Sequence, residues 1–333
     1  MVFKTTYNRA VETQNLSKGD IRMFKIFIDS GGNVPAVICK KYDIEVLSFT
    51  ELVDGKEIKC YNPDLLPLEE RLEGAKFYEA MRKGAKVSTT LLNTVELRDS
   101  FEPYVKDGFD VLYICISSGI SGTYNSARLA AEELMEDYAE RKVRIIDSKN
   151  ASLGAGLQAV KASMMRSEGA DIDAVAAKIE KDVPKMNGLF TVGNLKYLAK
   201  TGRIKSSVAF AGNVLNIKPI LRGDKDGFIV EVEKVRGRRK SLETICSYLV
   251  NNIEHPEEQI IGIAHADAYE EALECAKVIR NNVKVKDVII TSYDLCTGSH
   301  VGPDTIALFF LAKDRELQAA TDVGHKNLRF SDI

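Results

Sequence analysis

Short apolar segments alternate with amphipathic segments along the first half of the chain. Val111–Ile116 is continuously apolar, which is typical of a strand buried on both faces, and Val143–Ile146 is a second such run. Tyr124–Ala139 and Leu153–Met165 carry apolar residues at helical spacing. Strands that alternate with helices in this way predict βαβ units and a mostly parallel, Rossmann-like sheet.

The pattern changes after about Gly169. Ile229–Val235 alternates apolar and charged residues, so we expect a half-exposed, antiparallel strand that follows a turn at Gly223–Gly227. Further helices are expected at Ile172–Ile179, Leu242–Val250, Glu270–Ile279 and Thr305–Leu311, and strands at Gly188–Val192, Ile260–Ala264 and Val288–Thr291. These features predict a second α/β domain with a mixed sheet.

The whole pattern predicts an α/β protein with two α/β domains, and 333 residues suffice for two domains. We expect an N-terminal domain over residues 23–165 and a C-terminal domain over residues 166–313. A polar extension over residues 1–22 and a polar tail over residues 314–333 flank them.

Composition limits the partners and the compartment. The net charge is −2, from 46 basic and 48 acidic side chains, so no overall field favours nucleic acid or an anionic membrane. No apolar stretch reaches the ~18 residues of a membrane span, and the first twenty residues lack the apolar core of a signal peptide. The six cysteines form no C-x-x-C pair, which favours small buried side chains in a reducing compartment. We therefore expect a cytoplasmic protein without integral membrane association.

A serine- and glycine-rich loop follows the Val111–Ile116 strand and precedes a helix. Open α/β sheets bind ligands at this place, and the first N–H groups of a helix attract an anion. The candidate donors are Ser117, Ser118, Ser121, Gly122 and Thr123. The simpler alternative is that Ser121 or Thr123 only caps the helix, and the pattern alone favours neither interpretation.

Four other places offer polar or charged groups. Lys86–Thr90 is either the N-cap of a helix over Leu91–Phe101, which is favoured when taken alone, or a second wall of the same site. His265 ends an expected strand, where it is either a hydrogen-bonded structural residue or a donor to an anion. His300 is expected in a turn near the cleft, and Arg203 belongs to a small basic cluster that is either solvated surface or a docking patch for a partner.

Several short motifs occur together in a recognisable order. They are Asp29-Ser30, Ser117–Tyr124, Tyr197–Ile204, Leu215–Ile220, His265-Ala266-Asp267 and His300–Pro303. With these motifs the chain resembles the DegV family, the bacterial fatty-acid-binding proteins that serve as acyl-carrier subunits of fatty acid kinase. The resemblance extends from Phe24 to about Leu311.

The resemblance implies a DegV/EDD-like fold with one long-chain fatty acid buried between the two domains. It also implies that a partner fatty acid kinase phosphorylates the bound carboxylate, so this chain presents the substrate, is not itself an enzyme and needs no cofactor or metal. Arg203 would then contact the kinase. The residues implied to hold the carboxylate are Ser88, Thr89, Ser117, Ser118, Ser121, Gly122, Thr123 and His265.

The chain departs from the family pattern at three places. Val87 replaces one hydroxyl of the family's Thr-Ser-Gln-Pro run, Asn33 stands where an acidic residue is usual, and Asp304 replaces the last glycine of a Gly-Pro-Gly. Candidate apolar residues for the acyl slot are Ile120, Phe190, Phe210 and Leu215, although the sequence alone favours core packing for each of them.

Two other functions fit the same loop. The chain could be an enzyme that acts on a small carboxylated or phosphorylated molecule, or an interaction protein in which the loop is only a helix cap. A buried acyl chain favours the carrier, since each buried CH₂ contributes ~0.8 kcal/mol.

Overall fold

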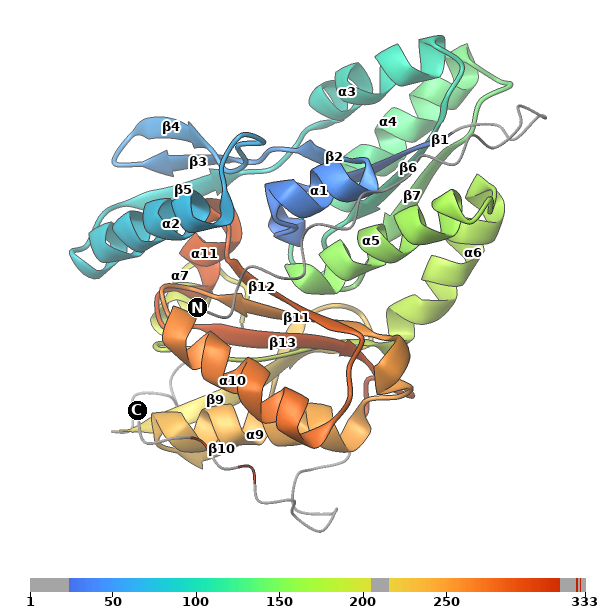
Figure 1. Cartoon of the computed structure of the whole chain (residues 1–333). Helices are drawn as coiled ribbons and strands as arrows, with labels where there is room; N and C mark the ends of the chain where they lie inside the picture. Colours follow the sequence, from blue (N-terminus) through green and yellow to red (C-terminus); the bar gives the residue numbers. More distant parts are fainter. Residues whose placement is uncertain (1–23, 205–215, 318–327, 329, 331–333) are drawn as a thin grey trace.

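The computed structural model describes residues 24–204, 216–317, 328 and 330, and the strands of this part form three sheets (Figure 1). The first sheet is parallel throughout and has the spatial order β2 (Ile44–Leu47), β1 (Phe24–Asp29), β6 (Asp110–Cys115) and β7 (Val143–Asp147). Its helices are α1 (Ala36–Tyr42), α3 (Thr94–Lys106), α4 (Thr123–Asp137), α5 (Leu153–Ser167) and α6 (Ile172–Asp182). The predicted parallel sheet is confirmed.

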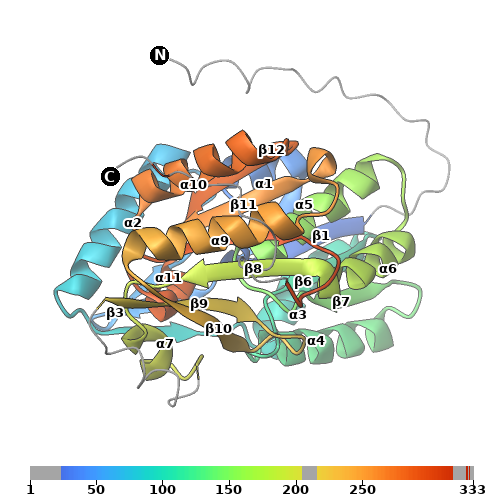
Figure 2. The ribbon, with the colours of Figure 1, turned by 90° about the horizontal axis from the view of Figure 1, so that it is seen from below.

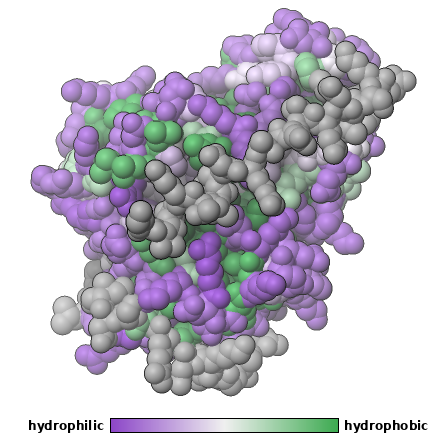
Figure 3. All heavy atoms as spheres, viewed as in Figure 1, coloured by the Kyte–Doolittle hydropathy of each residue, from purple (hydrophilic) through white to green (hydrophobic). Residues whose placement is uncertain are grey.

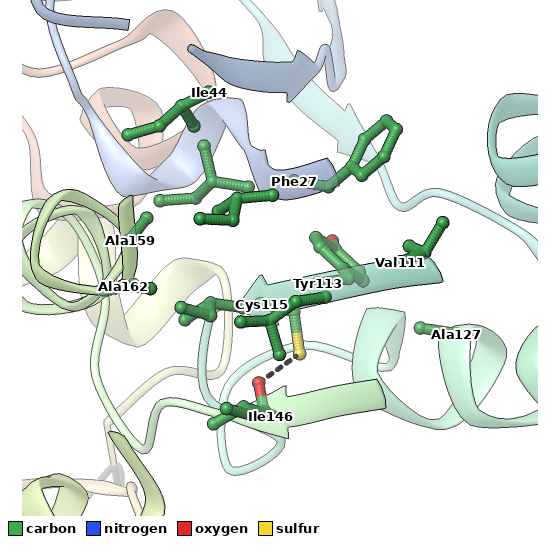
Figure 4. Packing of buried hydrophobic residues seen from close by; sticks show 14 of the residues in the cluster. Phe27, Ile44, Val111, Tyr113, Cys115, Ala127, Ile146, Ala159 and Ala162 are labelled. Atoms are coloured by element: carbon green, nitrogen blue, oxygen red, sulfur yellow. Dashed lines mark hydrogen bonds between the residues drawn. The ribbon is translucent and has the colours of Figure 1, made fainter. Parts of the chain in front are cut away.

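The centre of this first sheet is β6, which is buried along its whole length because its side chains are apolar on both faces. On one side Phe27 of β1 packs edge-on against Phe101 of α3, with ring centroids 5.1 Å apart. The Cys115 thiol donates to the Ile146 carbonyl of β7 at 3.4 Å (Figure 4). This packing fixes the carboxyl end of β6, where the serine- and glycine-rich loop begins.

The second sheet is mixed, as predicted. Its spatial order is β10 (Ile229–Arg236), β9 (Ile217–Gly223), β8 (Met186–Thr191), β13 (Ile306–Leu311), β11 (Ile260–His265) and β12 (Asp287–Ser292). Only β11 and β12 run parallel, and the other neighbours are antiparallel. The helices α9 (Arg238–Asn252) and α10 (Tyr269–Asn282) cover one face (Figure 2).

One predicted helix of this second unit is wrong. The segment expected to be helical over Thr305–Leu311 contains the strand β13, which pairs with β8 and β11. Six consecutive apolar residues satisfy a buried strand as well as a buried helix, and periodicity cannot separate the two at this length. The strand lies in the middle of the sheet, where both faces are covered.

A third, small sheet has the order β4 (Lys56–Lys59), β3 (Thr50–Val53) and β5 (Val87–Thr90). The interpretation of the segment containing β5 as a helix cap is wrong, because Asn93 caps α3 and its side chain accepts from the Glu96 N–H at 3.0 Å. The helix α2 (Pro67–Arg82) lies beside this sheet and contacts α11 (Leu295–Val301). Exposed apolar side chains, Ile58, Leu66, Leu68 and Leu72, belong to this region, and Figure 3 shows apolar surface there.

The packing of α6 bears on where the two units divide. The expected boundary at residue 165 falls inside α5, and Val175, Ala176 and Ile179 of α6 are buried in the core of the first sheet. We therefore propose a boundary at the 3-10 turn η2 (Val183–Lys185), which directly precedes β8. The extension over residues 1–22 and most of the tail lie outside the described residues.

Two expectations from composition can be compared with the fold. Five of the six cysteines are buried, Cys60 is partly exposed, and none forms a disulfide. Among the described helices, none combines the length and the apolar character that crossing a bilayer requires.

Candidate functional site

A cavity lies where the three sheets meet. Its volume is about 180 Å³, which is smaller than the ~300–1,000 Å³ of typical small-molecule sites. The first sheet's loops contribute Ile116, Ile120, Ser121, Gly122, Lys149, Asn150, Ala151 and Ser152, and the small sheet and the segments flanking it contribute Phe49, Thr89, Thr90 and Leu91. The C-terminal unit contributes Gly188, Phe190, Leu198, Arg203, Gly223, Gly227, Ile229, Tyr293, Cys296, Thr297, His300, Val301 and Phe309.

The polar groups of the cavity gather around His300 on α11. The Thr89 hydroxyl is 3.2 Å from Nε2 of this histidine, and the other ring nitrogen, Nδ1, is buried with no hydrogen-bond partner among the described residues. A neutral imidazole that accepts at Nε2 carries its proton at Nδ1. If the Thr89 hydroxyl donates, the buried Nδ1–H is left without an acceptor among the described residues.

The loop and the histidine are linked by Arg203. Its Nε donates to the Ile120 carbonyl of the loop at 3.3 Å. Burial, and secondly the positive charge of Arg203, lower the pKa of His300 to about 4. The imidazole is therefore neutral at physiological pH, while the guanidinium supplies positive charge beside it. Both groups favour an anion at this end of the cavity.

The serine- and glycine-rich loop serves the cavity through its second half. Ser121 and Gly122 line the cavity, and Gly122 begins the fifteen-residue helix α4, whose N-terminus carries partial positive charge. The Ser121 oxygen is 3.0 Å from the Thr123 hydroxyl and accepts the Thr123 N–H at 3.3 Å. Gly122 is the N-cap residue of α4, and no side chain caps this helix, so the interpretation of Ser121 as its cap is not supported.

The first half of the loop has other contacts. Ser117 is fully buried, and its hydroxyl donates to the Gly227 carbonyl at 3.0 Å and accepts the Gly119 N–H. The Ser118 hydroxyl is exposed and accepts from the Lys149 ammonium at 2.9 Å. Neither serine lines the cavity. Ser117 instead fastens the turn between β9 and β10 to the loop.

The small sheet contributes Thr89 and Thr90, at the end of β5, to the cavity. Thr89 lines it, whereas Ser88 is exposed on the opposite face of β5, since successive residues of a strand point to opposite sides. Thr90 also reaches the cavity rim. The interpretation of this segment as a second wall therefore holds for Thr89 and not for Ser88.

His265 lies outside the cavity. The residue is 2% exposed, its Nδ1 accepts the Ala268 N–H at 3.4 Å, and its ring meets that of Tyr269 edge-on. Burial, and then the charge of Arg71, lower its pKa to about 4. Of the two alternatives for His265, the structural one fits these contacts, and His300 is the histidine that lines the cavity.

Sequence reasoning gave one residue of the cavity the wrong secondary structure and missed another. His300 was expected in a turn but lies in α11, and its approach to Thr89 joins positions 211 residues apart. Its only signal in the sequence was the motif His300–Pro303. Lys149, which follows β7 and bonds Asp147 at 2.8 Å, lines the cavity without any motif to mark it.

The acyl-slot candidates divide into two groups. Ile120 and Phe190 line the cavity, together with further apolar residues, Phe49, Leu198, Ile229, Val301 and Phe309. Phe210 and Leu215 lie outside the described residues. A long apolar wall with polar groups gathered around one histidine is suited to an amphipathic anion.

Comparisons with known proteins agree on one family. The model of the DegV family, described as an uncharacterised protein, matches residues 23–313. A DegV domain-containing protein of Clostridium perfringens is 36% identical over 296 residues, which is 89% of this chain and 100% of the relative. One of Caldanaerobacter subterraneus is 31% identical and covers 86% of this chain and 98% of its own length.

Solved structures of the family have the same fold. A DegV lipid-binding protein from Thermotoga maritima has a TM-score of 0.74 at 29% identity and covers 88% of this chain and all of its own. A second Thermotoga maritima protein, described as having a fatty-acid-binding function, has a TM-score of 0.73 at 28% identity and covers 87% and 99%. A stearic-acid-binding protein from Eubacterium ventriosum has a TM-score of 0.75 at 25% identity and covers 87% and 99%.

Proposed function

Since the chain belongs to the DegV family, we propose that it binds one long-chain fatty acid in the cavity described above. The observation that carries this proposal is the amphipathic lining of one cavity. Phe49, Phe190 and Phe309 provide apolar surface, and Thr89 and His300 provide polar groups. The fatty-acid-binding functions of the solved relatives support the same ligand class.

The carboxylate belongs at the His300 end. A buried carboxylate is costly unless fixed donors satisfy it, and this end offers Nδ1–H of His300, the hydroxyl of Ser121 and the N-terminus of α4. Arg203 adds a positive charge within the same region. These groups orient the ligand, while the apolar wall supplies most of its affinity.

Burial of the acyl chain determines most of the binding affinity. Some fourteen methylenes at ~0.8 kcal/mol each amount to about 11 kcal/mol before the costs of association and ordering. The remainder corresponds to a dissociation constant between micromolar and nanomolar. Native mass spectrometry of protein purified without detergent should reveal a bound C14–C18 fatty acid. A cavity that stays empty, and that takes up no fatty acid on addition, would reject the proposal.

We further propose that the bound carboxylate is the substrate of a partner fatty acid kinase, which transfers a phosphoryl group to it and forms an acyl phosphate. Arg203 remains the candidate for docking. It lines the cavity, so it can act on the ligand, and it is only partly buried, so a partner protein can also contact it. The role expected of this chain in that step is presentation of the substrate.

The docking role can be separated from ligand binding by two charge reversals. Lys200→Glu changes an exposed residue of α7 (Lys196–Lys200) that does not line the cavity, and Arg203→Glu changes one that does. If this basic cluster docks the kinase, both variants should lose acyl phosphate formation, and Lys200→Glu should keep its fatty acid. Loss of the fatty acid from Arg203→Glu alone would assign Arg203 to the ligand site instead.

A further inference from the structure

Three carboxyl side chains lie behind the helix that carries His300. Asp29 and Glu51 are fully buried, and Asp294 caps α11 by accepting the Thr297 N–H at 2.9 Å. Asp294 also accepts from the side chains of Asn33 at 2.9 Å and Ser30 at 3.3 Å. Asp29 accepts from the Tyr113 hydroxyl and the Ile116 N–H. Two of the three acids thus have donors.

Glu51 is the exception. Both of its carboxyl oxygens are buried without a hydrogen-bond partner in the part of the chain that the structure describes. The Ser299 hydroxyl lies close enough to lower the pKa of Glu51 somewhat, but it donates to the Cys296 carbonyl at 2.8 Å and not to the carboxyl group. A buried carboxylate without donors is strongly disfavoured, and a protonated carboxyl is far less so.

The position of Glu51 places it next to the head-group end of the cavity. On β3 it is directly opposite Thr89 of β5, so the two side chains share one face of the small sheet with Cβ atoms ~5 Å apart. Thr89 in turn contacts Nε2 of His300. Only one side chain therefore separates the carboxyl of Glu51 from the imidazole that we assign to the ligand.

The groups that act on Glu51 are acidic or neutral. Asp294 and Cys296 face it from α11, Cys60 from the segment after β4, and Tyr78 from α2. The nearest lysine in sequence, Lys59 of β4, donates to the Thr50 hydroxyl at 3.0 Å and is exposed. Burial, and then the charge of Asp294, raise the pKa of Glu51 to about 8.

Resting on the proposed function, we propose that Glu51 is the proton-linked residue of this site: it takes up a proton from solvent when the fatty acid carboxylate binds beside His300. The anionic head group and an ionised Glu51 would repel each other across Thr89, since the buried Glu51 carboxyl is poorly screened by solvent. Binding therefore selects the neutral form of Glu51, and affinity falls as Glu51 ionises. The positive charge of Arg203 therefore favours an anionic head group most strongly while Glu51 is protonated and neutral.

The test is the affinity for cis-parinaric acid, a fluorescent C18 fatty acid, between pH 6 and pH 9. One linked proton weakens binding by up to ~10-fold per pH unit above the pKa of Glu51, so the wild-type Kd should rise about 3- to 10-fold from pH 7 to pH 9. Glu51→Gln mimics the protonated form and should bind equally well at both pH values. Glu57→Gln, on the exposed strand β4, is the matched control and should behave as wild type.

A wild-type Kd that is constant from pH 7 to pH 9, or an equal loss of affinity in Glu51→Gln, would overturn the inference. Proton uptake by the wild-type protein on addition of ligand at pH 8 in weakly buffered solution gives a second measurement that needs no variant, and no uptake would also overturn it. Proton uptake by His300 would instead be largest at acidic pH, well below pH 8, since the pKa of His300 is about 4 in the unliganded protein. Absence of parinaric acid binding at every pH would reject the proposed function and this inference with it.

Discussion

At the scale of single residues, the donor set around the ligand head group can be separated by substitution. His300→Ala removes the Nδ1–H donor and the partner of Thr89, so a carboxylate at this end would be left short of a hydrogen bond. We expect fatty acid binding to weaken by about 1–3 kcal/mol. Titration with parinaric acid at pH 7 measures this change.

The matched control for His300→Ala is Ser118→Ala in the same assay. The Ser118 hydroxyl is exposed, bonds Lys149 and does not line the cavity, so its removal should leave the affinity unchanged. A loss in Ser118→Ala equal to that in His300→Ala would contradict the position we assign to the carboxylate.

Four buried titratable residues make stability depend on pH in two directions. The pKa values of Asp29 and Glu51, raised by burial to about 7 and about 8, let the folded protein keep protons that the unfolded chain has lost. Their contribution is present below the unfolded values near pH 4 and is lost as the pH rises through 7 and 8. His265 and His300, with pKa values lowered to about 4, act oppositely, and their contribution is lost as the pH falls from 6.5 to 4.

From these signs we predict that the free energy of unfolding declines between pH 6.5 and pH 8.5 by about 1–3 kcal/mol, because the histidines, which are half protonated in the unfolded chain at pH 6.5, offset only part of the loss. Glu51→Gln should remove more than half of this decline. Urea denaturation at the two pH values measures it. A free energy of unfolding that rises over this interval would show that Asp29 and Glu51 are ionised in the folded protein at neutral pH.

At the scale of elements, the loop after β6 depends on a close approach of two backbones. A Cβ atom at Gly119 would lie 2.7 Å from the carbonyl carbon and oxygen of Gly227 in the β9–β10 turn. Backbone cannot yield as a flexible side chain does, so Gly119→Ala should push the turn away from the loop and break the Ser117 contact. We expect a loss of stability of about 1–3 kcal/mol, measured by urea denaturation.

Gly122→Ala provides the comparison for Gly119→Ala. Its Cβ would meet only the Leu91 side chain, at 3.3 Å, which can move. Stability should therefore change little in this variant. If Gly119→Ala were as stable as Gly122→Ala, the contact between the loop and the turn would not hold the two units together.

The elements that the sequence predicted correctly are those whose pattern is local. Val111–Cys115 is apolar on both faces and Ile229–Val235 alternates, and each lies in the expected kind of strand. The error at Ile306–Leu311 arises because a short apolar run has no period, and only its pairing with β8 and β11 decides its structure. Local patterns therefore predict elements better than they predict which elements share a sheet.

The candidate site was harder to predict than the fold because its residues come together through long-range packing. The loop Ser117–Thr123 could be recognised locally, since a strand, a glycine-rich turn and a helix follow one another. The choice between His265 and His300 depends on the small sheet meeting α11, and no spacing along the chain reports that contact. The sequence likewise gives no sign that Glu51 is buried, since it looks like an ordinary charged residue of a short strand.

At the scale of the whole molecule, an ion-pair network ties α2 and the small sheet to the C-terminal unit. Arg82, at the end of α2, contacts Asp267 after β11 at 2.5 Å and Asp304 before β13 at 2.7 Å. The same helix packs on α11, where the Tyr78 hydroxyl fills the space that a side chain at Gly298 would need. Motion of α2 away from the C-terminal unit would therefore loosen both walls of the head-group site.

From this network we predict that Arg82→Met accelerates release of bound fatty acid without changing any residue that lines the cavity. The three side chains are partly exposed, so the effect should be modest, about 2- to 10-fold in the dissociation rate at low salt. It should shrink in 1 M salt, where screening already weakens the ion pairs. Displacement of prebound parinaric acid by excess oleate, followed by stopped-flow fluorescence, measures the rate. Lys83→Met is the control, because Lys83 pairs only with Glu79 of the same helix, and equal rates in the two variants would exclude a gating role for the network.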